Sequence, residues 1–270
     1  MPHVEVGTVE YAYTERGSGP LVIFLHGTLS GKKSFARTIE QPRSGYRYVA
    51  FDWPGHGEST CDPTGWSVED LVDAVPALIA GLGETRAVLV GVSQGGAVGL
   101  RVALRHPGVL AGLVTVNAGA DPVSPEAVAR VGELGLALRD GTDSERREAA
   151  KLATGFHHPP DWAESHPELI EQEIQLILSH PREAAVHATN IPAQYESIED
   201  RLREISCPTL VVWGERDPRQ ERGPRMVAAI PDSDLCVIPD VGHHAQVEAP
   251  DLLAEAVGEF LARIERSNGA

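Results

Sequence analysis

Residues 87–96 read Ala-Val-Leu-Val-Gly-Val-Ser-Gln-Gly-Gly and place Ser93 two residues from a glycine on each side. The apolar run over 87–92 predicts a buried strand, and residues 94–106 predict a helix with small residues in its first turn. A serine on the turn between them is typically strained, with its side chain pushed out above the sheet. Because the flanking glycines leave room for so tight a turn, we interpret Ser93 as a nucleophile rather than as part of an ordinary Gly/Ser turn.

The rest of the chain alternates between short apolar runs and helical segments. Continuous apolar strands separated by helices are typical of a parallel sheet that is covered by helices on both faces. Alternating residues around Gly7 also predict a hairpin over 4–15 at the edge of this sheet. The other expected strands are 21–25, 46–51, 110–116, 209–213 and 235–238, and the other expected helices are 32–40, 68–80, 223–230 and 250–264.

Residues 121–203 interrupt this alternation, because they are helical in character and contain no convincing strand. Connections between elements of an α/β core usually take about 2 to 6 residues, so this segment is too long for a simple loop. We therefore predict one α/β core domain made of residues 1–120 and 204–270, with residues 121–203 inserted as a helical cap, or lid, that packs on the core.

Composition limits the classes of protein to which the chain can belong. Its 270 residues suffice for one large domain, and a formal net charge of −16 argues against nucleic acid as a partner. No apolar run approaches the ~18 residues of a membrane span, and the N-terminus lacks the features of a signal peptide. We expect a cytoplasmic protein with no membrane partner and a small-molecule substrate. The three cysteines are far apart and fit neither a disulfide framework nor a paired-cysteine zinc site.

Two further polar residues follow strands of the second half, at the edge where open α/β sheets bind ligands. Asp217 follows the strand over 209–213, and His243 follows the strand over 235–238. A serine hydroxyl needs a base to take its proton, and the base needs a carboxylate that fixes its tautomer and stabilises the imidazolium. The order Ser93, Asp217, His243 therefore predicts a catalytic triad, although each residue alone is equally at home in a loop.

Neighbouring residues offer alternatives to two members of this triad. His244 adjoins His243, but the preceding glycine favours His243 as the base. Asp121 lies just beyond the strand that precedes the cap, from where a carboxylate can also reach the histidine, and Glu215 lies on the same loop as Asp217. We favour Asp217 as the acid and keep Asp121 as the main alternative.

The oxyanion of an acyl-transfer reaction needs two backbone N–H donors. One is expected from Gln94, which follows the nucleophile at the positive end of its helix. The loop His26-Gly27-Thr28-Leu29 follows the strand over 21–25, and we expect the second donor to be the N–H of Thr28, with Leu29 as the alternative. We interpret His26 as a brace for this loop, and the Gln94 side chain as a helix cap rather than a further donor.

These motifs together resemble the α/β-hydrolase fold serine hydrolases over nearly the whole chain. The resemblance rests on His26-Gly27 and on the strand, tight turn and helix around Ser93, which we call the nucleophile elbow. It also rests on three segments, which read Asp-Trp-Pro-Gly-His-Gly-Glu-Ser over 52–59, Trp-Gly-Glu-Arg-Asp over 213–217, and Gly242-His243 followed by Glu-Ala-Pro over 248–250. It implies a mostly parallel central sheet covered by helices. A serine in place of aspartate argues against a haloalkane dehalogenase or an epoxide hydrolase. Length and cap resemble the 3-oxoadipate enol-lactonase-like hydrolases and small esterases.

The leading hypothesis is a serine hydrolase that cleaves a small carboxylic ester or lactone through an acyl-enzyme, without a cofactor. A C–C bond hydrolase, a cofactor-free oxygenase or a lyase on the same fold is an alternative, although the Thr28 loop lacks the extra glycines of the meta-cleavage C–C hydrolases. A receptor-like protein with vestigial hydrolysis is another. Candidate substrate-binding residues are Leu29, Trp53, Phe156, Trp162 and Tyr195.

Adjacent histidines in the expected cap, His157 and His158, invite a metal hypothesis. Adjacent residues on a helix point in different directions, and the sequence suggests no third ligand, so we expect no metal. The same cap segment also contributes Gln194 as a residue that can face the pocket.

Overall fold

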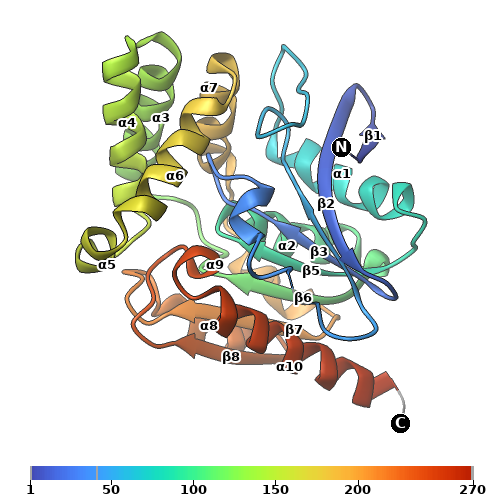
Figure 1. Cartoon of the computed structure of the whole chain (residues 1–270). Helices are drawn as coiled ribbons and strands as arrows, with labels where there is room; N and C mark the ends of the chain where they lie inside the picture. Colours follow the sequence, from blue (N-terminus) through green and yellow to red (C-terminus); the bar gives the residue numbers. More distant parts are fainter. Residues whose placement is uncertain (1, 41, 269–270) are drawn as a thin grey trace.

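The structure is a computed structural model that describes residues 2–40 and 42–268, and a central sheet runs through it (Figure 1). The sheet has eight strands in the order β1-β2-β4-β3-β5-β6-β7-β8. The pairs β1–β2 and β2–β4 are antiparallel, and the remaining pairs are parallel. The strands are β1 (His3–Val6), β2 (Val9–Gly17), β3 (Leu21–Leu25), β4 (Arg47–Phe51), β5 (Ala87–Val92), β6 (Leu110–Val116), β7 (Thr209–Gly214) and β8 (Ser233–Ile238).

Helices cover both faces of this sheet, as its continuous apolar strands require. One face packs against α1 (Val68–Gly81), α2 (Gln94–Arg105) and α8 (Arg222–Ala229). The other packs against α10 (Pro250–Asn268) and the 3₁₀ helix η1 (Lys32–Phe35). Strands β3 and β5 are buried along their whole length, because both of their faces lie against these layers. Each fully buried aliphatic side chain there contributes about 1.5 to 3 kcal/mol to folding.

The chain between β6 and β7 forms five α-helices that lie together at one end of the sheet (Figure 1). Capping residues set where two of these helices begin: the Ser124 side chain accepts a hydrogen bond from the N–H of Ala127, and Thr142 forms a capping box with Glu145. The division into a core and a cap over 121–203 stays a prediction. The five helices are α3 (Pro125–Asp140), α4 (Asp143–Gly155), α5 (Pro160–Ser165), α6 (Pro167–Ser179) and α7 (Arg182–Asn190), and the 3₁₀ helices η3 (Ile191–Gln194) and η4 (Glu199–Glu204) follow them.

One expected element differs from the structure. The helix expected over 32–40 is only the four-residue 3₁₀ helix η1 followed by turns. Asp52 accepts hydrogen bonds from both the N–H and the ammonium group of Lys32, and the Phe35 side chain is fully buried in the core. These long-range contacts hold the segment against the sheet in a tighter conformation than its local sequence predicts.

The short helix α9 (Ala245–Glu248) was not expected from the sequence, and it follows directly after His243 and His244. In the part of the chain that the structure describes, no helix combines the length and apolar character that a membrane crossing requires.

Candidate active site

Ser93 lies on the turn between β5 and α2 in a left-handed conformation, with φ 52° and ψ −114°. A non-glycine residue with positive φ carries backbone strain, which persists only where the surrounding structure imposes it. Here the Ser93 N–H donates to the carbonyl of Val116 on β6 at 2.8 Å, and the Ser93 carbonyl accepts from Ala97 within α2 at 2.9 Å. The turn is therefore fixed at both ends, and its side chain reaches the cavity described below.

The two glycines that flank the turn are required by close backbone contacts. A Cβ atom on Gly91 would lie 2.3 Å from the carbonyl of Gly95, and a Cβ atom on Gly95 would lie 2.1 Å from the carbonyl oxygen of Leu25. Both distances are far below van der Waals contact. The glycines thus allow α2 to pack directly against β3 and β5 immediately after the serine.

Asp217 and His243 come together from the ends of β7 and β8. The Asp217 Oδ2 atom lies 2.5 Å from Nδ1 of His243, and both side chains are buried. Burial alone would raise the pKa of Asp217, but the hydrogen bond from His243 and the nearby charges hold it below its ordinary value. Burial is also the main reason why the pKa of His243 falls to about 4, so at neutral pH an aspartate is paired with a neutral imidazole.

Asn117 connects the two loops that carry this pair. It follows β6 with a φ of 50°, and its amide oxygen accepts from the N–H of Gly214 at 2.8 Å. Its amide nitrogen donates to the carbonyls of Gly242 and His243, at 3.1 and 2.7 Å. One buried side chain thus fixes the end of β7 and the histidine loop relative to each other.

The loop after β3 lies beside the first turn of α2. Gln94 begins α2, so its N–H has no acceptor within the helix. The N–H of Thr28 takes part in none of the backbone hydrogen bonds that the described residues form outside helices and strands. Leu29 has a φ of 58°, which marks a sharp, strained turn at this point. His26 braces the loop, because its Nε2 accepts from the N–H of Trp53 at 2.9 Å.

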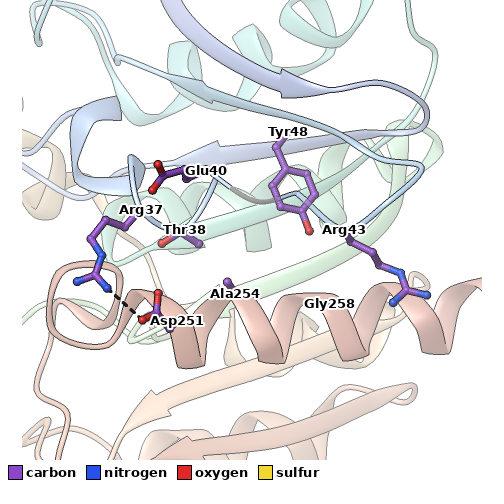
Figure 2. A pocket seen from close by; sticks show the side chains of 8 residues that line it. All are labelled: Arg37, Thr38, Glu40, Arg43, Tyr48, Asp251, Ala254 and Gly258. Atoms are coloured by element: carbon purple, nitrogen blue, oxygen red, sulfur yellow. Dashed lines mark hydrogen bonds and ion pairs between the residues drawn. The ribbon is translucent and has the colours of Figure 1, made fainter.

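A cavity of about 390 Å³ brings most of the predicted site residues together. A hollow of about 680 Å³ elsewhere on the molecule lies against α10 and has the Arg37–Asp251 ion pair, at 3.0 Å, at one end (Figure 2). None of the predicted catalytic residues lines that hollow. The predicted residues that line the smaller cavity are Thr28, Leu29, Ser93, Gln94, Phe156, Tyr195 and His243.

Two of the expected substrate-binding residues lie away from this cavity. Trp53 is fully buried in the core, where its indole N–H donates to the carbonyl of His26 at 3.0 Å. Trp162 stacks between His158 and His166, with ring centroids 4.7 and 4.3 Å away. The Gln194 amide oxygen instead accepts from the N–H of Val68 at the start of α1. These residues pack and cap other elements, so they are not part of the cavity wall.

The alternative acid Asp121 also lines the cavity but pairs with a different residue. Its carboxylate lies 2.7 Å from the guanidinium of Arg222 on α8, whereas Asp217 contacts His243. The other alternative acid, Glu215, accepts from the N–H of Asp240 at 3.0 Å. The geometry therefore favours Asp217 over both alternatives as the partner of the histidine.

A buried network of histidines and glutamates joins the helical segment to the histidine loop. His158 lies between two carboxylates, 2.8 Å from Glu173 on α6 and 3.0 Å from Glu248 on α9. Glu248 also accepts from the N–H of Gly242 at 2.6 Å, and the carbonyl of His157 accepts from the N–H of His243 at 2.8 Å. Contacts from two distant parts of the chain thus hold the loop that carries His243.

The ligand atoms of His157, Glu173 and His244 lie within 4.8 Å of one another, which raises the question of a metal ion. The imidazoles of His157 and His244 are stacked, with centroids 3.8 Å apart and planes inclined by 22°. A metal binds in the plane of each imidazole, so one ion cannot lie on the lone pairs of two rings stacked in this way. Moreover, His244 Nδ1 already lies 2.9 Å from Glu173. The cluster fits a hydrogen-bonded network better than a metal centre.

Sequence reasoning missed three residues that contact the candidate triad or its loops. Asn117 and Glu248 hold the loops, and Arg219 contacts both Asp217 and His243. The signal for Asn117 was its place directly after a strand, where asparagine tolerates positive φ. Arg219 follows Asp217 by two residues, and its charge so near a predicted histidine–carboxylate pair was also visible in the sequence.

The fold and the arrangement of this site define an enzyme of the hydrolase class. A family model described as the alpha/beta hydrolase fold matches residues 20–250, and the chain belongs to this family. A 2-hydroxy-6-oxononadienedioate/2-hydroxy-6-oxononatrienedioate hydrolase from Pseudomonas putida is 30% identical over 262 residues, which cover 92% of this chain and 90% of the relative. A thermophilic esterase from Thermogutta terrifontis superposes with a TM-score of 0.87 at 30% identity, covering 97% of this chain and 98% of the esterase.

The enol-lactonase from Burkholderia xenovorans has the same fold. It superposes with a TM-score of 0.85 at 23% identity, with 97% of this chain and 100% of the lactonase covered. The resemblance predicted from the sequence motifs is thereby confirmed at the level of fold and family.

Proposed function

We propose that this protein hydrolyses small carboxylic esters or lactones through an acyl-enzyme formed on Ser93. The observation that carries this proposal is the buried contact of 2.5 Å between Asp217 and His243, at the edge of the same cavity into which the strained turn directs Ser93. A serine, a histidine and a carboxylate in this arrangement have the chemistry of acyl transfer.

In the first step, Ser93 Oγ attacks the carbonyl carbon while Nε2 of His243 takes its proton. Asp217 holds the Nδ1–H of the ring and stabilises the imidazolium that forms. The negative oxygen of the tetrahedral intermediate is bound by the N–H groups of Thr28 and Gln94, and the positive end of α2 adds to this stabilisation. His243 then gives the proton to the leaving alkoxide, and the C–O bond breaks.

In the second step, water replaces the serine. His243 takes a proton from water as the oxygen attacks the acyl carbon, and then returns a proton to Ser93 Oγ as the acid leaves. For a lactone the alcohol released in the first step stays attached to the acyl group, so the product is one hydroxy acid. The two substrate classes therefore need the same residues.

The size of the cavity supports a small substrate. A volume of about 390 Å³ lies at the low end of the range for ligand sites. Leu29, from the loop after β3, and Phe156 and Tyr195, from the chain between β6 and β7, contribute apolar side chains to its walls. The methylene groups of a short acyl chain fit such walls.

Hydrolysis of a C–C bond is the second candidate, because the Pseudomonas putida relative is named as a 2-hydroxy-6-oxononadienedioate hydrolase. The loop at Thr28 carries one glycine, whereas the resemblance to known families implies further glycines there in the meta-cleavage C–C hydrolases. We therefore expect ester hydrolysis to be the faster reaction when both kinds of substrate are offered.

The proposal is tested with a panel of p-nitrophenyl esters, aliphatic lactones and a 2-hydroxy-6-oxo-dienoate, assayed beside Ser93→Ala. A fluorophosphonate probe should add its mass to the peptide that contains Ser93 and abolish the activity. Turnover of the dienoate alone would support the second candidate. Native protein that hydrolyses nothing on the panel and leaves Ser93 unlabelled would contradict the proposal.

The acid of the triad is tested by comparing Asp217→Asn with Asp121→Asn. We expect Asp217→Asn to lower kcat by about 10⁴-fold, the size of the effect of the equivalent change in a serine protease. Asp121→Asn, which removes the partner of Arg222, should keep most of the activity. A large loss at Asp121 alone would reverse the assignment.

A further inference from the structure

Arg219 lies against the candidate catalytic pair in a position that the proposed reaction does not use. Its Nη2 atom is 2.8 Å from Nδ1 and 3.3 Å from Nε2 of His243. The same guanidinium lies 3.3 to 3.5 Å from the carboxylate of Asp217. The side chain is 40% exposed and lines the cavity beside His243.

The contact between Arg219 and Nδ1 of His243 is unfavourable in the tautomer that the triad requires. Nδ1 carries the hydrogen that is shared with Asp217, and an arginine has donors but no acceptor. Because Nη2 is close to both ring nitrogens, it lies over the face of the imidazole and forms no hydrogen bond with Nδ1. Because the remaining contacts to Asp217 are long, the hydrogen-bonding capacity of the guanidinium is largely unused.

The contact with Nε2 has a consequence for catalysis. Nε2 is the nitrogen that must accept the serine proton, and the guanidinium Nη2 lies only 3.3 Å from it. A fixed positive charge at that distance also opposes formation of the imidazolium. An arginine in this position slows the reaction of a neutral substrate unless another group draws it away or balances its charge.

Within residues 2–40 and 42–268, the groups around His243 do not supply that balance. The charged and titratable groups that face the ring are Asp217 and Arg219 from the loop after β7, His157 from the helical segment, and the adjacent His244. Asp217, the one carboxylate among them, is shared between the imidazole and Arg219.

The other arginines of the cavity are engaged elsewhere. Arg222 is paired with Asp121 at 2.7 Å. Arg130 lies over the ring of Phe156, with its guanidinium carbon 5.2 Å from the ring centre. Of the three arginines that line the cavity, Arg219 is therefore the one available to bind an anion close to the reacting bond.

We propose that Arg219 binds a carboxylate of the substrate and thereby selects esters of short dicarboxylic acids that keep one free carboxylate. Binding this group balances the charge of the guanidinium, which then opposes formation of the imidazolium less. The inference rests on the proposed ester hydrolysis at Ser93. It names the acyl part of the substrate and gives Arg219 a specificity-determining role.

The test compares monoethyl glutarate with ethyl pentanoate, which has the same chain length but ends in a methyl group. Release of acid is followed by titration for the wild type and for Arg219→Gln. The wild type should favour the glutarate in kcat/KM by roughly 10- to 100-fold, the range for hydrogen bonds to charged groups. Arg219→Gln should lose this preference, because the glutarate becomes slower and the pentanoate becomes faster.

Arg216→Gln is the matched control, since it removes the same charge from the same loop. Arg216 pairs with Asp161 at 2.6 Å and does not line the cavity, so its loss should leave the preference unchanged. Labelling of Ser93 by a fluorophosphonate checks that each variant is folded and competent for acylation.

The two proposals fail in different ways. Equal or faster hydrolysis of ethyl pentanoate by the wild type, or an unchanged preference in Arg219→Gln, would overturn the role of Arg219 and leave ester hydrolysis intact. Failure to hydrolyse either ester, together with an unlabelled Ser93, would overturn the proposed function itself.

Discussion

The hydroxyl of Thr28 donates a hydrogen bond of 2.9 Å to the amide oxygen of Gln94 and so joins the loop after β3 to the first residue of α2. These are the two residues whose N–H groups we propose as oxyanion donors. The side-chain bond fixes their separation before substrate binds, which is the condition for effective stabilisation of an oxyanion. The Gln94 amide nitrogen is buried and finds no hydrogen-bond partner among the described residues. Its burial therefore lowers the free energy of unfolding.

We predict that Thr28→Val, which removes the hydroxyl and keeps the shape, lowers kcat on a small ester by about tenfold with little change in KM. That factor corresponds to about 1.4 kcal/mol, the scale of one hydrogen bond. Thr28→Ser should retain most of the rate. In a double-mutant cycle, Thr28→Val combined with Gln94→Leu should be little slower than Gln94→Leu alone. Fully additive losses would show that the two side chains act independently.

The three hydrogen bonds of Asn117 predict a loss of both stability and rate on substitution. Asn117→Ala removes them and places alanine at a positive φ, so the free energy of unfolding should fall by about 2 to 4 kcal/mol. Asn117→Gly relieves the backbone strain but still lacks the bonds. Denaturant unfolding and kcat of both variants measure the two effects. If the glycine variant kept full kcat, the amide would have no role in positioning His243.

The glycine contacts at the elbow predict that Gly95→Ala prevents formation of a competent site. Its Cβ would lie 2.1 Å from the carbonyl oxygen of Leu25, so α2 must move away from β3. We expect an activity loss of at least 10²-fold, because a displacement of about 1 Å is this costly in a preorganised site. Gly132→Ala, on a helix position with nothing within 4 Å, is the control and should stabilise the protein slightly. If the Gly95→Ala enzyme were fully active, the close packing of α2 against β3 would not be required for the site.

The network around His158 predicts a pH dependence of stability. Burial lowers the pKa of His158, but its bonds to Glu173 and Glu248 outweigh burial and raise the pKa to about 9. A folded pKa above the unfolded value of about 6.5 contributes stability that is full below pH 6.5 and is lost as pH rises toward 9. The melting temperature should therefore fall over this interval, and less steeply in His158→Gln. Equal slopes in the two proteins would exclude His158 as the cause.

The lowered pKa of His243 predicts activity in mildly acidic solution. The histidine must be neutral to accept the serine proton, so kcat/KM should fall only as pH drops through about 4. In Arg219→Gln the descending limb should move to higher pH, because a nearby positive charge is lost. Enzyme returned to pH 7 after acid exposure provides the control for unfolding. If kcat/KM of the wild type already fell near pH 6.5, burial would not be what sets the pKa of His243.

Local patterns made much of the fold predictable. The elbow at Ser93 depends on glycines only two residues away, and β3 and β5 are apolar along their whole length, so neither required knowledge of distant contacts. Asp217 and His243 were predictable because parallel strands end at one edge of a sheet. The pairing of β7 with β8 brings those two ends together.

Long-range contacts made the rest unpredictable. Residues 32–35 form a 3₁₀ helix in place of the expected α-helix because Asp52 and the core hold Lys32 and Phe35, and these partners are remote in sequence. The sequence suggested Trp53 and Trp162 as substrate-binding residues, but hydrophobicity carries no information about which neighbour each one meets, and both contact other residues. The same holds for Arg219, whose charge was visible but whose contact with His243 required the structure.

The central claim is that Ser93 becomes acylated during turnover, and rapid acid quenching tests it most directly. Wild-type enzyme is mixed with p-nitrophenyl butyrate, quenched within the first turnover, digested and analysed by mass spectrometry. We predict a butyryl group on the peptide that contains Ser93, in an amount that matches the initial burst of p-nitrophenol. If deacylation is faster than acylation, no burst appears, and the wild type is then treated with a p-nitrophenyl carbamate, whose carbamoyl group leaves the serine slowly. Turnover of the ester by the wild type with neither a butyryl nor a carbamoyl group on Ser93 would contradict the account.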